Sequence, residues 1–192
     1  MEKRDIERTK QQLLTAAEEL LISCGSADEV TSRAITQRAG VNLAMINYCF
    51  GSRDELLYQV FLRLMTKAQQ KEPEMIAVLM SEASPAEKLI EVHCIMIKLM
   101  TENYNYSKAV TEYILLSRDM SRGMEGLPFV QAHFAGRKTE EECRLIACQL
   151  TSISELAVLR FREMKELCGI DLTDEEQRRK FVTENVNRFL EV

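Results

Sequence analysis

The spacing of apolar residues along the chain is that of α-helices almost throughout. Between residues 5 and 24 the apolar positions recur at intervals of three and four, which places them on one helix face: Leu13, Leu14, Ala17, Leu20 and Leu21. Later stripes predict helices over residues 53–65, 74–81, 86–104, 107–120, 140–168 and 174–190, with a glycine-broken stretch at 123–136. No alternating run rich in Val, Ile or Thr indicates a strand, so we expect an all-α fold.

Four of these helices also have a recognisable first turn. In each, a Ser or Thr stands three residues before a Glu, the spacing of a reciprocal capping box, at residues 52–55, 84–87, 139–142 and 173–176. Pro85 is also suited to the first helical position. Residues 92–100 are apolar almost all round, interrupted only by His93 and Lys98. This pattern predicts a central helix that other helices surround.

Two short helices joined by a glycine turn are predicted after the first helix. Thr31 can cap a helix over residues 32–39, Gly40 supplies the turn, and Asn42 can cap a second helix that ends near Cys49. A helix-turn-helix needs such a turn, and it needs apolar residues where the two helices touch. The expected inward positions are Ile35, Ala39, Val41, Ile46 and Cys49, and the expected outward positions of the second helix are Asn42, Leu43, Ala44, Asn47 and Tyr48.

The charge of the chain is unevenly distributed. A net charge of −5 argues against a nucleic-acid partner, because neutralisation of phosphates supplies most non-specific affinity. The segment from Val30 to Arg53, however, contains no Asp or Glu and carries Arg33, Arg38 and Arg53. This basic segment coincides with the two short helices. Nucleic acid therefore remains a candidate partner.

Composition argues against several other classes of protein. No apolar stretch reaches the roughly 18 residues that a membrane span needs, and the charged N-terminus leads into an amphipathic pattern rather than a signal peptide. We therefore expect a cytoplasmic protein without a membrane segment. The 6 Cys show no CxxC or zinc spacing, and with 2 His and no Gly-rich phosphate loop nothing assembles an active site. We expect no enzyme activity, no metal and no cofactor.

Three stretches resemble the DNA-binding signature of the tetracycline-repressor (TetR) family of transcription regulators: Thr31-Ser-Arg-Ala-Ile35, Ala39-Gly-Val-Asn42 and Ile46-Asn-Tyr-Cys-Phe-Gly-Ser-Arg-Asp-Glu-Leu-Leu57. The resemblance covers roughly residues 9–61. Thr36 stands where the family usually has Ala, and we expect it to be buried with its hydroxyl bonded to a carbonyl one turn back. Asn47 and Cys49 stand where the family usually has Tyr and an aromatic or His. The resemblance implies a helix-turn-helix DNA-binding domain over 1–55 and an all-helical effector-binding and dimerisation domain over 56–192.

The resemblance also implies roles for individual residues. The residues that would contact phosphates are Thr31, Tyr48 and Arg53, and those that would approach base edges are Arg33, Leu43, Ala44 and Asn47. Asn42 would also belong to the DNA-binding surface. Arg can bond guanine through two donors and Asn can pair with adenine, each pair being worth about 1–3 kcal/mol of discrimination. Arg38 lies on the far side of its helix and is expected to be a solvated charge.

A regulator of this type implies a homodimer. Two helix-turn-helix units read half-sites of a palindromic operator about 34 Å, or a small multiple, apart. The last two predicted helices, 140–168 and 174–190, would pair with their copies, and a small-molecule effector would release the repressor from DNA. Candidate pocket residues combine apolar bulk with a few polar tips on the middle helices: His93, Met96, Met100, Tyr104, Tyr113 and Phe134.

Two other functions stay open on the same scaffold. A cysteine-based redox sensor would use Cys24, Cys49 or Cys143, of which only Cys143 has a basic neighbour, Arg144. An all-α interaction module that binds no DNA would give Arg33 no role in binding its partners.

Overall fold

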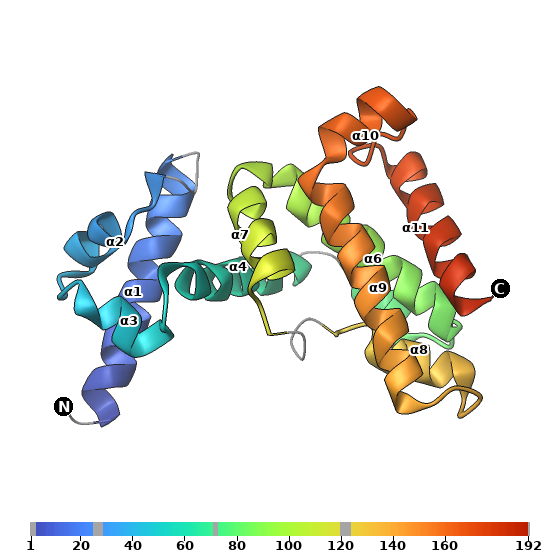
Figure 1. Ribbon diagram of the computed structural model, residues 1–192, viewed down its shortest axis with the longest axis horizontal. Coiled ribbons are helices and arrows are strands. Elements are labelled where there is room, and N and C mark those ends of the chain that lie inside the picture. The colour runs from blue at the N-terminus through green and yellow to red at the C-terminus, as the bar shows by residue number, and fades with distance from the viewer. Residues whose placement is uncertain (1–2, 25–28, 71–72, 120–123, 192) are drawn as a thin grey trace. The chain divides into compact units, whose positions relative to one another are not determined.

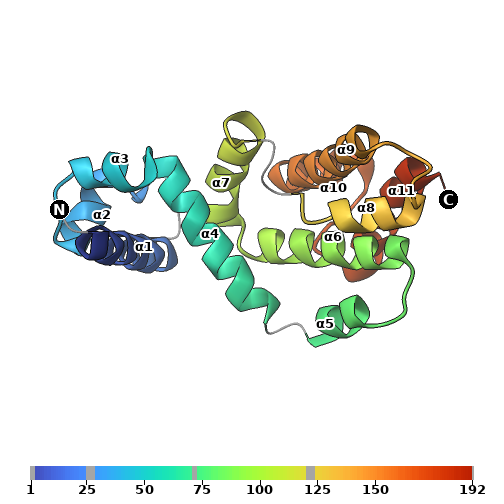
Figure 2. The ribbon, with the colours of Figure 1, turned by 90° about the horizontal axis from the view of Figure 1, so that it is seen from below.

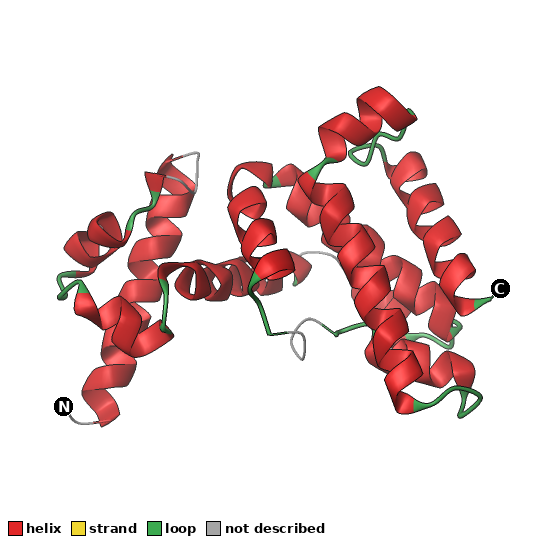
Figure 3. Ribbon diagram, viewed as in Figure 1, coloured by secondary structure: helices red, strands yellow, loops and turns green. Residues whose placement is uncertain are grey.

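The computed structural model describes residues 3–24, 29–70, 73–119 and 124–191. These residues form eleven α-helices and no strand, which confirms the expected all-α class (Figure 3). None of the described helices combines the length and the apolar character that crossing a membrane requires.

The chain divides into two compact units. Unit 1 comprises Met1–Lys67 and Asn105–Ile114, and unit 2 comprises Ala68–Tyr104 and Leu115–Val192. α4 (Arg53–Gln69) crosses the predicted domain boundary between residues 55 and 56 and lies in unit 1 for most of its length, and that boundary stays a prediction.

Unit 1 is built on the N-terminal helix. α1 (Lys3–Cys24) packs against both α2 (Ser32–Ala39) and α3 (Ala44–Phe50), as Figure 1 shows. The predicted stripe of α1 supplies the core, since Leu13, Ala17 and Leu21 are buried. Ile35 of α2 and Ile46 of α3 are buried as well. Burial of these apolar groups stabilises two helices that are too short to persist alone in water.

Unit 2 is arranged around one helix. Its elements are α5 (Pro73–Met80), α6 (Pro85–Glu102), α8 (Leu127–Phe134), α9 (Glu140–Leu159), α10 (Phe161–Cys168) and α11 (Glu175–Leu190), while α7 (Tyr104–Leu116) falls mostly within unit 1. α6 packs against α5, α8, α9 and α11. Figure 2 shows α8 and α9 on one side of α6 and α5 on the other. The predicted central helix is thus confirmed.

The predicted helix over residues 140–168 is wrong in one respect, because it is broken at Arg160. Arg160 has φ −114° and ψ 24° and separates α9 from α10. At this break the Tyr104 hydroxyl donates to the Leu159 carbonyl at 2.9 Å, and the Tyr104 ring meets Phe161 edge-on. A distant side chain therefore satisfies a carbonyl at the end of α9, which local spacing could not reveal.

The capping predictions are confirmed at two starts and corrected at a third. Ser84 and Thr139 both make the full reciprocal capping box, with Glu87 and Glu142 respectively. Before α11 the cap is Asp174, whose carboxylate accepts the Gln177 amide at 2.9 Å. Thr173 had been predicted as this cap, but its hydroxyl donates to Asp171 at 2.6 Å instead.

Candidate nucleic-acid interface

The turn between α2 and α3 depends on a left-handed glycine. The Thr31 hydroxyl accepts the Ala34 amide at 3.2 Å and so caps α2, as predicted. Gly40 ends the helix with φ 67°, a conformation in which a side chain would be strained. The Val41 amide then donates back to the Thr36 carbonyl at 3.1 Å. These bonds set the direction in which the chain enters α3.

Thr36 behaves as the sequence predicted. Its side chain is buried, and its hydroxyl donates to the Ser32 carbonyl one turn earlier at 2.8 Å. The polar group is therefore satisfied inside its own helix. With Thr36 satisfied in this way, α2 packs against α1.

α3 begins and ends within a few residues. The Asn42 side chain accepts the Ala44 amide at 2.9 Å, so Asn42 organises the turn before the helix, although the helix itself starts at Ala44. Gly51, with φ 80°, ends α3. The buried Phe50 was missed among the inward residues; its position four after the inward Ile46 is the signal that could have found it.

The outward face of the helix-turn-helix is exposed as predicted. Tyr48 is 64% exposed, whereas Ile46 two positions earlier is 1% exposed. Seven of the eight residues predicted to contact DNA are exposed: Thr31, Arg33, Asn42, Leu43, Ala44, Asn47 and Tyr48. They come from both short helices and the turn between them. The helix-turn-helix therefore has one side that packs within unit 1 and an opposite side that is exposed.

Arg53 is the exception among the eight. Its side chain is half-buried, and its Nε donates to the Val30 carbonyl at 2.7 Å, while Nη1 lies 3.1 Å from the Asp54 carboxylate. The first bond ties the start of α4 to the residue before the α2 cap. Arg53 thus holds together the two ends of the candidate interface, in addition to any contact that it makes outside the protein.

The two arginines of α2 differ in their partners. Arg38 Nε lies 2.6 Å from the carboxylate of Glu19 on α1. Arg33 is exposed, and no residue in the described part of the chain forms an ion pair with it. Gln37 is exposed four residues after Arg33 and was missed by the sequence reasoning, although that spacing places both on one helix face.

This surface has the chemistry of an anion-binding face. The Thr31 hydroxyl already accepts a hydrogen bond, and its own hydrogen can donate to a phosphate oxygen. The N-terminus of α2 adds unpaired amides and the positive end of the helix dipole. Arg33 supplies a full positive charge in a segment without carboxylates.

The six predicted pocket residues are divided between the two units. Tyr113 belongs to unit 1, where its hydroxyl donates to Glu55 at 2.8 Å and its ring contacts Tyr58. The other five belong to unit 2, and three of these are buried: His93, Met100 and Phe134. Met96 and Tyr104 are half-buried, and the Tyr104 hydroxyl donates to the Leu159 carbonyl at the end of α9.

His93 has an internal partner in the core of unit 2. Its Nδ1 lies 2.9 Å from Ser154 Oγ, and that hydroxyl donates to the Leu150 carbonyl at 3.1 Å. Because the serine hydrogen is used in this way, His93 donates to Ser154. Burial lowers the pKa of His93 from 6.5 to about 4, so the ring is neutral at physiological pH.

Glu155, which follows Ser154 on α9, belongs to a buried ion pair. Arg118 Nη2 donates to the Glu155 carboxylate at 3.2 Å, and Glu155 is only 4% exposed. Burial raises the pKa of Glu155 to about 7, against the opposing effect of Arg118. Charge on this carboxylate is therefore costly despite its partner.

The cysteines considered for a redox role differ in their surroundings. Cys143 is 3% exposed, and burial raises the pKa of Cys49. The side chain of Cys24 lies outside the described part of the chain. Within that part, no three residues among His, Cys, Asp and Glu lie close enough together to hold a metal ion.

The helices α9, α10 and α11 form a second exposed surface. An apolar groove of about 350 Å³ runs over Ile153, Leu156, Ala157, Met164, Leu167 and Phe181. Leu156 is half exposed and Leu167 almost fully so. An exposed apolar patch of this kind often marks a contact with another protein.

Neither protein-family models nor curated protein sequences match this chain. The resemblance of residues 9–61 to the TetR family therefore stays a prediction that depends on the motif alone.

Proposed function

We propose that this protein is a DNA-binding transcription regulator, and that α2 and α3 form its DNA interface. The observation that carries the proposal is the division of the two helices into a mainly apolar buried side and an exposed side that presents Arg33, Asn47 and Tyr48. The exposed side lies in a segment with no carboxylate. A positively charged, polar helix surface is what the phosphates and base edges of DNA require.

In this proposal α3 enters the major groove. Asn47 is exposed and reads adenine, while Arg33 at the start of α2 reads guanine. Thr31 and Tyr48 contact the phosphates on either side. Arg53 keeps the start of α4 against Val30, so it fixes the relative position of these phosphate contacts.

The regulator acts as a homodimer in this proposal. The apolar groove over α9, α10 and α11 is the surface that a second copy covers, and it includes the side chains of Leu156 and Leu167. A dimer places two α3 helices at the spacing of a palindromic operator, about 34 Å or a small multiple. Two weak half-site contacts then add in one complex.

Repression is released by a small molecule that binds unit 2. Such an effector must bind the state that is unable to hold DNA more tightly than the competent state. A coupling free energy of about 1–3 kcal/mol would weaken DNA binding about 5- to 150-fold.

The test is capture of genomic DNA fragments by the purified protein, repeated across a salt series. We expect a palindromic site and a steep loss of binding with salt. Arg33→Ala should abolish selective capture. Arg38→Ala is the matched control, because it removes the same charge from the same helix at a residue that pairs with Glu19.

The opposite result would favour an all-α interaction module. If fragments are not captured, or if binding does not depend on salt, the surface of α2 and α3 does not serve DNA. Equal losses in Arg33→Ala and Arg38→Ala would also oppose the proposal, because they would indicate a general charge effect without a defined interface.

A further inference from the structure

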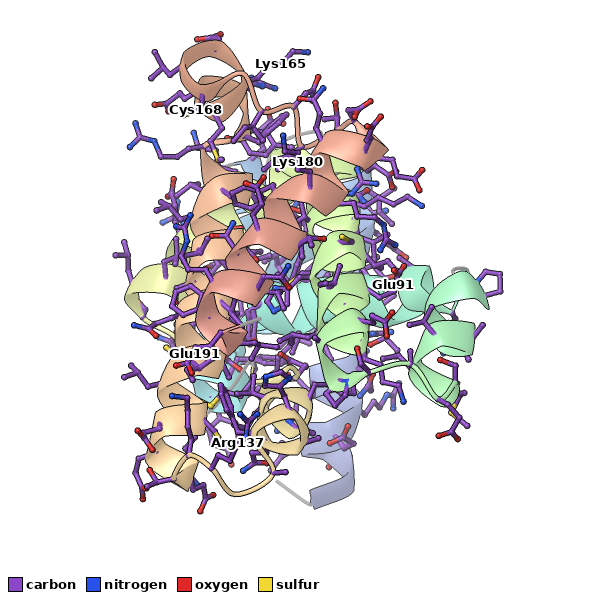
Figure 4. The ribbon with its side chains drawn as sticks, turned by 90° about the vertical axis from the view of Figure 1, so that its right-hand side faces the viewer. Glu91, Arg137, Lys165, Cys168, Lys180 and Glu191 are labelled. Atoms are coloured by element: carbon purple, nitrogen blue, oxygen red, sulfur yellow. The ribbon has the colours of Figure 1, made fainter. Side chains whose placement is uncertain are left out.

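A small pocket lies between α6 and α11 in unit 2. Its volume is about 100 Å³, and charged side chains from both helices line it: Glu91 and Lys98 from α6, and Glu175, Arg178 and Arg179 from α11. Figure 4 faces these two helices and labels Glu91 on α6 and Lys180 on α11. The pocket contains none of the residues proposed for DNA or effector binding, so the inference goes beyond the proposed function.

Arg178 is the unusual member of this group. It is 7% exposed, and its Nη1 donates to the carbonyls of Leu172 and Thr173 at 3.1 and 3.3 Å. No carboxylate in the described part of the chain forms an ion pair with it. Buried guanidinium groups are ordinarily paired with an anion, because an uncompensated charge is costly to remove from water. A guanidinium group can bind a carboxylate through two parallel hydrogen bonds.

The other charges of the pocket leave a positive balance. Arg179 Nη2 lies 2.5 Å from the Glu91 carboxylate, so these two charges largely cancel. Over the whole lining, two carboxylates, Glu91 and Glu175, face three cationic side chains, Lys98, Arg178 and Arg179, so the formal balance is one positive charge. Cys94 also lines the pocket, and burial raises its pKa to about 11, so the thiol contributes no charge. The pocket therefore matches one negative charge.

The size and walls of the pocket narrow the class of anion. A single water molecule needs a cavity volume of only about 10–15 Å³, so this pocket has room for a small organic ion. Cys94 and Ile95 supply an apolar wall. The carboxylates of Glu91 and Glu175 disfavour a doubly charged phosphate.

We infer that the pocket between α6 and α11 binds a small monocarboxylate, which pairs with Arg178 and places its apolar end against Ile95 and Cys94. The bound anion bridges the central helix and the last helix of unit 2. The sequence carries a signal for this site, because Arg178 stands four residues before Val182, and Val186 and Leu190 continue the same buried stripe. An arginine in an otherwise apolar stripe brings a positive charge into the buried side of the helix.

The experiment is an NMR titration of the whole protein with sodium propionate, with sodium chloride used to keep ionic strength constant. We expect saturable shifts in the amide signals of residues 91–98 and 175–179. Propionamide has the same shape without the charge and should cause none. Phosphate should bind more weakly than propionate. Saturation by propionamide, or shifts only elsewhere, would overturn the inference.

Two variants with opposite expected effects keep the test decisive. Arg178→Gln should weaken propionate binding by about tenfold or more, because a charged hydrogen-bonded pair is lost. Glu91→Gln should strengthen binding by a few-fold, because a repelling carboxylate is removed, and this result stays informative if Arg178→Gln fails to fold. Arg188→Gln, at an exposed position of α11 outside the pocket, should change neither. Weaker propionate binding by Glu91→Gln would contradict the inference. So would unchanged propionate binding by Arg178→Gln together with a loss of self-association.

Discussion

Polar side chains are used in opposite ways by the surface of α2 and α3 and by the core of unit 2. On the first, Arg33, Asn47 and Tyr48 are exposed. In the second, His93 is bonded to Ser154 and Glu155 to Arg118, all of them buried or nearly so. Buried polar groups must find partners inside the protein, whereas exposed groups stay available to a partner outside it. The candidate interface and the predicted pocket therefore differ less in their residue types than in whether their polar side chains are already bonded inside the protein.

The largest expected effect contrasts two adjacent residues of α3. Ile46→Ala should lower the free energy of unfolding by about 2–5 kcal/mol, because Ile46 is buried against the rest of unit 1. Asn47→Ala should change it by less than about 0.5 kcal/mol, because Asn47 is exposed, but it should weaken operator binding by about 1–3 kcal/mol. Urea unfolding and fluorescence anisotropy measure the two quantities. A large loss of stability in Asn47→Ala would contradict the division of α3 into two faces.

The next effect concerns pH and the two buried titratable groups of unit 2. Glu155 has a pKa of about 7 in the folded protein against 4.5 in the unfolded chain, so its stabilising contribution is full below 4.5 and is lost as pH rises through 7. His93 has a folded pKa of about 4 against 6.5, so its contribution is full above 6.5 and is lost as pH falls toward 4. Each difference corresponds to about 3 kcal/mol, and the two slopes oppose each other between pH 4.5 and 6.5.

Single variants should separate the two slopes. In Glu155→Gln the remaining His93 should make the free energy of unfolding fall as pH decreases from 7 to 5. In His93→Asn, which keeps a donor for Ser154, the remaining Glu155 should make it rise over the same range. Urea unfolding followed by circular dichroism at several pH values measures both. Parallel profiles in the two variants would show that these groups do not control the pH dependence of stability.

The sequence was sufficient where the determining contact is local. Ser84 and Thr139 cap their helices with a partner three residues away, and the Thr36 hydroxyl reaches Ser32 within one helix. The exposed face of α3 follows from helical periodicity in the same way. The predicted cap of α11 is wrong because Thr173 and Asp174 are both suitable cap residues. The structure uses Asp174, while the Thr173 hydroxyl donates to Asp171.

The sequence was insufficient where distant helices meet. The break at Arg160 coincides with the hydroxyl of Tyr104, a residue far away in the chain. Tyr113 was grouped with His93 because both lie on middle helices, yet Tyr113 bonds Glu55 in unit 1. Periodicity tells which residues of a helix turn inward, but it does not tell which helix they meet. For this reason periodicity predicted which residues of α2 and α3 are exposed, whereas the choice of pocket residues stays a prediction.

A smaller effect tests whether Thr31 has a structural role besides its proposed contact with phosphate. Thr31→Ala should cost about 1 kcal/mol of stability, because the Ala34 amide loses its capping partner. Thr31→Ser keeps the hydroxyl and should restore both stability and operator binding. If Thr31→Ala binds DNA as tightly as the parent protein, the hydroxyl serves the helix only. Thermal unfolding and anisotropy with the same operator fragment distinguish these roles.

The smallest expected effect is that of Arg38, which shares the α2 helix with Arg33 but pairs with Glu19. Both side chains of this pair are about half exposed, so solvent screens the attraction and Arg38→Ala should cost at most about 0.5 kcal/mol, with less at high salt. Operator affinity should change less than it does in Arg33→Ala, and Glu19→Gln should resemble Arg38→Ala in stability. If Arg38→Ala instead weakens DNA binding as much as Arg33→Ala does, the ion pair with Glu19 opens in the complex. Both arginines of α2 would then belong to the interface, and internal pairing would cease to mark which exposed charges are available to a partner.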